Sequence, residues 1–106
     1  MVIISGERAS GKTSLIVRGV DFSKFTIIVY DEPTNFREIM AVLKKNEINL
    51  DSIYFLKFNE FVRSLAIEEE NINLQVVFWD IALTSMLPIY HDIREKVRWG
   101  YWVVRT

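Results

Sequence analysis

Cysteine is absent from the sequence, and histidine occurs once, as His91. Disulfides and thiolate metal sites are therefore excluded, and a histidine-rich metal site is excluded as well. No apolar run approaches the length of a membrane span, and the first residues lack the anatomy of a signal peptide. We therefore expect a cytoplasmic protein with no membrane partner. The compact chain, rich in isoleucine and glutamate, would also fit an intracellular protein encoded by a virus.

Charge of one sign is not in excess, because 13 basic and 14 acidic residues give a formal net charge of −1. This balance supplies no bulk attraction for nucleic acid or for an anionic membrane. What the chain has in quantity is apolar residues, 50% of the total, and aromatic residues, 13%. A chain of 106 residues with this composition predicts one globular domain, 1–106, because two domains would each be too small to bury a core.

The most specific motif lies near the start of the chain. The pattern G-x-x-x-x-G-K-[ST] occurs at Gly6-Glu7-Arg8-Ala9-Ser10-Gly11-Lys12-Thr13, between the β-branched run 1–5 and the apolar stretch 15–17. A strand followed by this loop and a helix is the context of a phosphate-binding P-loop. The glycines let backbone N–H groups point at phosphate, and the helix beginning near Lys12 adds its dipole. Lys12 is expected to reach the β- and γ-phosphates of ATP, and the Thr13 hydroxyl to bind Mg²⁺.

Apolar strands and amphipathic helices alternate along the rest of the chain. The predicted strands are 1–5, 25–30, 53–58, 74–79 and 101–105. The first helix is expected to stop at Gly19, the second to be capped by Asn35 with Glu38, and the third to be capped by Asn59. The segment 81–88 fits either a loop or a short helix, and 89–97 predicts a helix that Gly100 ends.

This alternation predicts an α/β fold, a three-layer αβα sandwich around a mostly parallel five-stranded sheet. Ligands of such sheets bind at the carboxyl ends of the strands. A P-loop ATPase needs a carboxylate there, near Mg²⁺. Two apolar strands end in one: 76–79 is followed by Asp80, and 27–30 by Asp31-Glu32. A second acid would polarise the attacking water if ATP is hydrolysed.

In the order of its elements the chain resembles the RecA-type ATPase core, the family of RecA/RadA recombinases, KaiC-like proteins and replicative helicases. The resemblance covers almost the whole chain, although only the P-loop is a sharp motif. It implies that Glu32 activates the water and that Asp80 is the Walker B acid, which holds the water shell of Mg²⁺ with Thr13. It further implies that Ser14 contacts the α-phosphate, and that Arg105 or Thr106 serves as a polar sensor. No arginine finger is identifiable; Arg94 and Arg98 are candidates, but arginines on helices are more often surface charges.

A rival assignment makes Asp31-Glu32 the Walker B pair, since Asp31-Glu32-Pro33-Thr34-Asn35 resembles the text that follows Walker B in ABC transporters. An ABC domain is rejected because 106 residues leave no room for its helical subdomain and the Leu-Ser-Gly-Gly motif is absent. Sheet order discriminates the two assignments: the metal-binding acid is expected on the strand beside residues 1–5.

Two further groups of residues raise other functions. Ser85, His91 and Asp92 suggest a hydrolase, but there is no G-x-S-x-G elbow, and a surface histidine is the favoured interpretation.

Trp79 and Trp102 lie in predicted strands and are expected in the core. Trp99, beside Arg98, is the aromatic residue that could face a partner or nucleic acid. Nucleic acid is nevertheless weakly supported, because 81–92 holds no lysine or arginine.

The sequence therefore predicts an ATP-binding P-loop protein, a Mg²⁺-dependent ATPase of RecA-like type in nucleic-acid metabolism, acting as a homo-oligomer. The alternative is a nucleotide-binding regulatory or assembly module with little or no hydrolysis. A small-molecule kinase ranks below both because no arginine-rich lid segment is present. A purely structural role would require the P-loop to be accidental.

Overall fold

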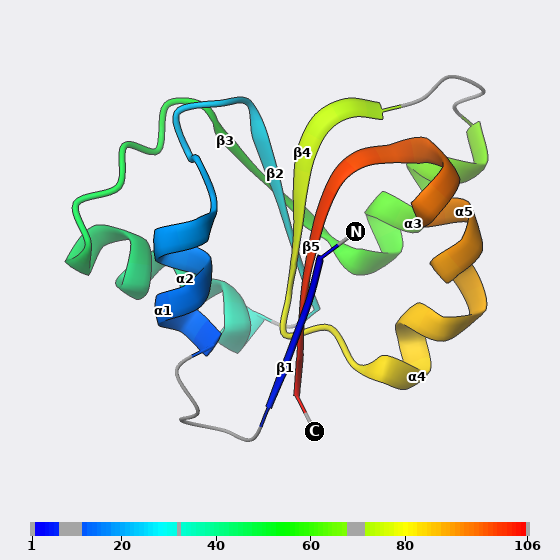
Figure 1. Ribbon diagram of the computed structural model, residues 1–106, viewed down its shortest axis with the longest axis horizontal. Coiled ribbons are helices and arrows are strands. Elements are labelled where there is room, and N and C mark those ends of the chain that lie inside the picture. Colours follow the sequence, from blue (N-terminus) through cyan, green and yellow to red (C-terminus); the bar gives the residue numbers. More distant parts are fainter. Residues whose placement is uncertain (1, 7–11, 32, 68–71, 106) are drawn as a thin grey trace.

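The fold is built on a single parallel sheet (Figure 1). The computed structural model describes residues 2–6, 12–31, 33–67 and 72–105. The strands of the sheet are β1 (Val2–Gly6), β2 (Thr26–Tyr30), β3 (Ile53–Lys57), β4 (Ile72–Trp79) and β5 (Val97–Arg105). They pair in the order β1-β5-β4-β2-β3, and every neighbouring pair is parallel. The predicted α/β fold with a five-stranded parallel sheet is confirmed.

Helices cover both faces of this sheet (Figure 1). One face carries α1 (Lys12–Gly19) and α2 (Pro33–Lys45). The other carries α3 (Phe58–Ile67), α4 (Leu83–Met86) and α5 (Tyr90–Lys96), with the 3₁₀ turn η1 (Leu87–Ile89) between the last two. None of the helices in the described part of the chain is long and apolar enough to cross a membrane.

Two apolar clusters, one on each face, hold the helices to the sheet. The cluster under α1 and α2 includes Ile16, Ile39, Val77 and Trp79, and the cluster under α3, α4 and α5 includes Phe61, Phe78, Met86, Ile93 and Trp102. The central strands supply both clusters because successive side chains of a strand point to opposite faces. Both tryptophans expected in the core, Trp79 and Trp102, are buried there.

The starts of two helices differ from the prediction. α2 begins at Pro33, so Asn35 lies inside the first turn and is not the cap. Proline suits this first position because its fixed φ is already helical and the N–H it lacks has no partner in a first turn. α3 begins at Phe58, one residue before Asn59, whose side-chain oxygen accepts a hydrogen bond from the Glu60 N–H.

The prediction that Gly100 ends the last helix is wrong. α5 ends at Lys96, and β5 begins at Val97, four residues before the predicted start of the strand at Tyr101. Val97 pairs with Ile72 on β4, and Gly100 is a buried position opposite Val76. Strand pairing with β4 therefore overrides the four-residue spacing that assigned Val97 to a helix.

Candidate functional site

All five strands end at the same edge of the sheet, because the sheet is parallel (the lower edge in Figure 1). At this carboxyl edge β1 ends at Gly6 and lies in register with Arg105, the end of β5. β4 ends at Trp79 and is followed by Asp80, and β2 ends at Tyr30 and is followed by Asp31. The first glycine of the P-loop motif and both candidate acids therefore lie along one edge, as expected for ligand binding in such a sheet.

The order of the strands contradicts the expectation that a candidate metal-binding acid ends the strand beside β1. The strand beside β1 is β5, and neither β4 nor β2 is its direct neighbour. At a spacing of about 4.8 Å between strands, β4 lies about 10 Å from β1, and β2 about 14 Å. Asp80 is thus the nearer acid, on the side of β5 that faces away from β1. The order favours Asp80 over Asp31 as the acid close to the P-loop strand.

Asp80 has an uncommon backbone conformation. Its φ is 59°, in the left-handed region, whereas β4 before it is extended. Non-glycine residues at positive φ are uncommon, and aspartate is among those that tolerate it. Such conformations gather at functional sites, where the surrounding structure holds them in place. The side chain is partly buried at the sheet edge.

The first turn of α1 follows the P-loop motif as predicted. Lys12 is the first residue of α1, and Thr13 and Ser14 follow in the same turn. The predicted end at Gly19 is also confirmed. Since the first turn of a helix presents free N–H groups and a positive dipole, its placement after β1 is suited to an anion.

Part of the predicted site lies outside the described residues. These are the P-loop residues Glu7, Arg8, Ala9, Ser10 and Gly11, the acid Glu32 and the sensor candidate Thr106. The side chains of Lys12, Thr13, Ser14 and Arg105 are likewise not described, although their backbone is. The roles of these residues therefore stay predictions.

A metal site made by protein side chains alone is not found in the described part of the chain, where no three histidine, cysteine or acidic residues gather. The predicted site does not need such a cluster. Mg²⁺ usually binds one or two carboxylates, several waters and the phosphates of its nucleotide. Asp80 and the hydroxyl of Thr13 are the donors that the sequence assigns to this ion, and both are hard oxygen ligands.

The structure does not support a hydrolase site at His91. Its ring pairs with Glu95 one turn further along α5, at 3.1 Å, and its side chain is 82% exposed. The expectation of a surface histidine is confirmed.

Arg98 lies near the start of β5, seven residues before Arg105, so it is about 23 Å from the carboxyl edge of its own sheet. It therefore cannot act as an arginine finger on the site of its own chain.

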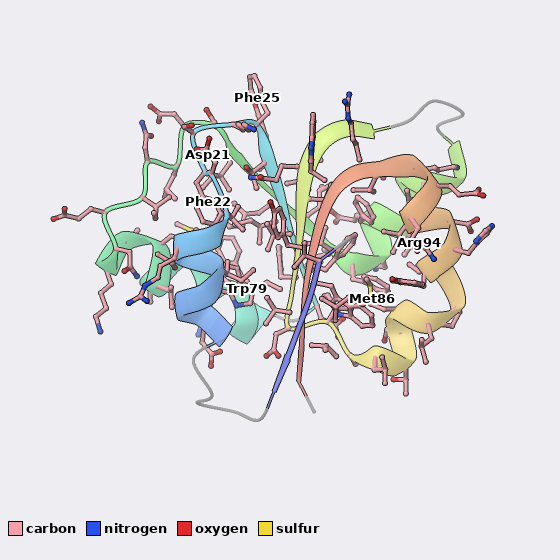
Figure 2. The ribbon with its side chains drawn as sticks, viewed as in Figure 1. Asp21, Phe22, Phe25, Trp79, Met86 and Arg94 are labelled. Atoms are coloured by element: carbon pink, nitrogen blue, oxygen red, sulfur yellow. The ribbon has the colours of Figure 1, made fainter. Side chains whose placement is uncertain are left out.

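The opposite, amino edge of the sheet carries exposed aromatic side chains. Trp99 is 42% exposed, with Arg98 4.7 Å and Lys24 5.7 Å from its ring centroid. Phe25, which Figure 2 shows at this end, stacks on Tyr54 with ring centroids 6.3 Å apart. Sequence reasoning singled out Trp99 and Arg98 but missed Lys24 and Phe25. The only signal for Phe25 was its place at the start of a predicted strand.

The chain matches no family model, no curated protein and no solved structure, so the fold and its residues carry the functional argument.

Proposed function

We propose that this protein binds Mg·ATP at the carboxyl edge of its sheet and hydrolyses it, as a RecA-like P-loop ATPase. The observation that carries the proposal is the common edge of Gly6 and Asp80, with only β5 between their strands. The P-loop motif, which would supply the phosphate donors, begins with Gly6 at this edge, and its last two residues, Lys12 and Thr13, open α1. Asp80, two strands from β1 at the same edge, can supply the carboxylate that a metal bound to the outer phosphates needs.

Each residue has one role in this proposal. Backbone N–H groups of Gly6 to Thr13 hold the phosphates, and Lys12 neutralises the β- and γ-phosphates. Thr13 and Asp80 hold Mg²⁺ with its water shell, which supplies charge neutralisation on the phosphates when bound. Glu32 accepts the proton of the attacking water, whose oxygen displaces ADP from the γ-phosphorus.

The first experiment measures ATP binding by calorimetry in Mg²⁺. Lys12→Ala should weaken binding at least about ten-fold, because a charge-assisted hydrogen bond of about 1.5–3 kcal/mol is lost. Lys45→Ala is the matched control, since this lysine is exposed in the last turn of α2. Equal affinity in Lys12→Ala and the wild type would show that the motif does not hold phosphate.

The second experiment separates hydrolysis from binding alone. Phosphate release should fall at least about 100-fold in Glu32→Gln, a loss within the range expected for a general base, while ATP affinity stays unchanged. A steep rise of the specific rate with protein concentration would indicate that a second copy completes the site. Tight ATP binding without turnover at every concentration would favour the alternative, a nucleotide-binding regulatory or assembly module.

A role in nucleic-acid metabolism is proposed for the amino edge of the sheet. Exposed rings that stack on bases, flanked by cations, are the elements of single-strand binding sites. Trp99 lies between Lys24 and Arg98, and Phe25 and Tyr54 are 59% and 55% exposed. The formal charge of the chain is −1, so the attraction for phosphate has to be local, and these two cations would supply it beside Trp99.

Tryptophan fluorescence tests this role directly, because Trp79 and Trp102 are buried and Trp99 is exposed. An oligothymidylate should quench the exposed fraction of the emission, and Trp99→Ala should weaken binding roughly ten-fold. Arg94→Ala is the control, since this arginine also lies over a ring, that of Tyr90, on the flank that Figure 2 shows. Unchanged emission at low salt would exclude the amino edge as a nucleic-acid site.

A further inference from the structure

The chain changes faces of the sheet at Asp80. Trp79 packs in the cluster under α1 and α2, whereas Ile81 packs in the cluster under α3, α4 and α5. Figure 2 shows Trp79 on the side of the sheet that carries α1, and Met86, the last residue of α4, on the opposite side. In a continued strand, residues 79 and 81 would lie on the same face, since side chains alternate with a period of two. The left-handed φ of 59° at Asp80 produces this reversal.

Both residues beside Asp80 are fixed by burial. Trp79 is 7% exposed and Ile81 is fully buried. The carbonyl of Ile81 would be an unpaired polar group inside the core if nothing donated to it, and such groups are costly. The indole N–H of Trp102 donates to this carbonyl, with Nε1 3.0 Å from the oxygen.

Trp102 is itself well placed to act as an anchor. It is 2% exposed and lies on β5, in register with Phe78 on β4 and with Ile3 on β1. Its ring packs 6.2 Å from that of Tyr90 on α5. The strand that separates the P-loop strand from the strand of Asp80 thus carries the side chain that holds the turn after Asp80.

We propose that Trp102 is a positioning residue, whose hydrogen bond to Ile81 holds the left-handed turn and so sets the affinity of the nucleotide site for Mg²⁺. This inference rests on the proposed function, in which Asp80 holds the water shell of the metal. A displaced Asp80 carboxylate would lose its hydrogen bonds to the waters of Mg²⁺, and metal binding would weaken. The phosphate contacts of the P-loop come from other elements and are not expected to change.

The test is the gain in ATP affinity on adding Mg²⁺, measured by calorimetry in EDTA and then in Mg²⁺. Trp102→Phe removes the donor and keeps an aromatic ring. It should reduce the Mg²⁺-dependent gain about five- to ten-fold, as expected for one hydrogen bond, and leave the affinity in EDTA within about two-fold of the wild type. Tyr101→Phe is the matched control, because it removes a side-chain donor from the neighbouring residue of the same strand, which packs on the other face of the sheet.

A second variant is needed if the smaller ring of phenylalanine at position 102 destabilises the core. Trp102→benzothienylalanine keeps the bicyclic shape and replaces the N–H by sulfur, which cannot donate. In an Asp80→Asn background neither change at 102 should reduce the Mg²⁺ gain further, because the carboxylate they position is already gone.

The outcomes are distinct. A reduced Mg²⁺ gain with unchanged affinity in EDTA supports the inference. An unchanged gain, or an equal loss with and without Mg²⁺, overturns it and leaves the proposed function standing. Absence of ATP binding by the wild-type protein overturns the proposed function, and the inference falls with it.

Discussion

The side-chain amide of Gln75 donates a hydrogen bond to the hydroxyl of Thr26, at 2.9 Å and across 49 residues of sequence. The same nitrogen donates to the carbonyl of Asp21 at 3.0 Å, and the Thr26 hydroxyl donates to the carbonyl of Lys24 at 2.8 Å. Thr26 is fully buried and Gln75 is 5% exposed. These bonds attach the loop before β2 to the middle of the sheet, so the amino edge is held by a buried polar network.

Removing the side-chain amide of Gln75 should destabilise the fold. Gln75→Leu leaves the Thr26 hydroxyl and the Asp21 carbonyl without the amide, and should lower the free energy of unfolding by about 1–3 kcal/mol. Urea unfolding measures the change. Thr84→Val, at an exposed position of α4, is the control and should stay within about 0.5 kcal/mol of the wild type. A loss no larger than that of the control would show that the network does not stabilise the fold.

The C-terminus of α2 offers a stabilising substitution. The N–H of Ile48 donates to the Leu43 carbonyl at 3.0 Å, and the N–H of Glu47 donates to the Lys44 carbonyl at 3.1 Å, which is a Schellman motif. Glu47 takes the left-handed position of this motif, with φ 56°, where glycine is preferred.

Glu47→Gly should therefore raise the free energy of unfolding by about 0.5–1 kcal/mol, because glycine adopts this φ without steric cost. Glu47→Ala separates the backbone effect from loss of the carboxylate and should not stabilise the protein. Thermal and urea unfolding of the three proteins provide the comparison. Equal stability of the glycine and alanine variants would contradict a strained backbone at residue 47.

Asp80 should show a conflict between stability and metal binding. Its φ of 59° favours glycine, and both Asp80→Gly and Asp80→Ala remove the carboxylate. Asp80→Gly should be more stable than Asp80→Ala by about 1 kcal/mol, while both lose the Mg²⁺-dependent gain in ATP affinity. Parallel measurements of urea unfolding and ATP binding check the two halves separately. A Mg²⁺ gain that survives in either variant would remove Asp80 from the metal site.

Much of the fold followed from the sequence because the central strands are nearly continuous apolar runs. The extent of β2 up to Tyr30 was predictable for this reason, and the end of α1 was predictable from the glycine at position 19. The start of β5 was not, because Val97 fits a helical spacing and becomes extended only when Ile72 pairs with it. The local hydrophobic pattern therefore predicts whether a segment is a helix or a strand, whereas pairing between distant strands determines where the strand begins.

The candidate site was predictable in its residue types and not in its geometry. The acid at the end of β4 could be named from the apolar run before it, but the position of β5 between β1 and β4 depends on the whole sheet. The left-handed φ of Asp80 and the hydrogen bond from Trp102 to Ile81 have no sequence signal, because they arise where the chain changes faces. Long-range packing determines these features.

The ionisation of Asp21 makes the stability of the fold depend on pH. Hydrogen bonds from the Ser23 hydroxyl and from the Ser23 N–H, helped by the charge of Lys24, hold the pKa of the Asp21 carboxyl below its ordinary value of 3.8. Because the pKa is lower in the folded state than in the unfolded state, the carboxylate stabilises the fold above the unfolded pKa. That stabilisation is lost as the pH falls through the folded pKa.

The pKa of Asp21 can be measured from the pH dependence of its carboxyl carbon shift by NMR. Ser23→Ala removes the largest cause of the shift and should raise the pKa toward 3.8. Ser64→Ala is the control, because the hydroxyl of Ser64 donates to the Phe61 carbonyl on α3 and does not contact Asp21. If the pKa of Asp21 is the same in Ser23→Ala and the wild type, the Ser23 hydroxyl is not the cause of the lowered pKa.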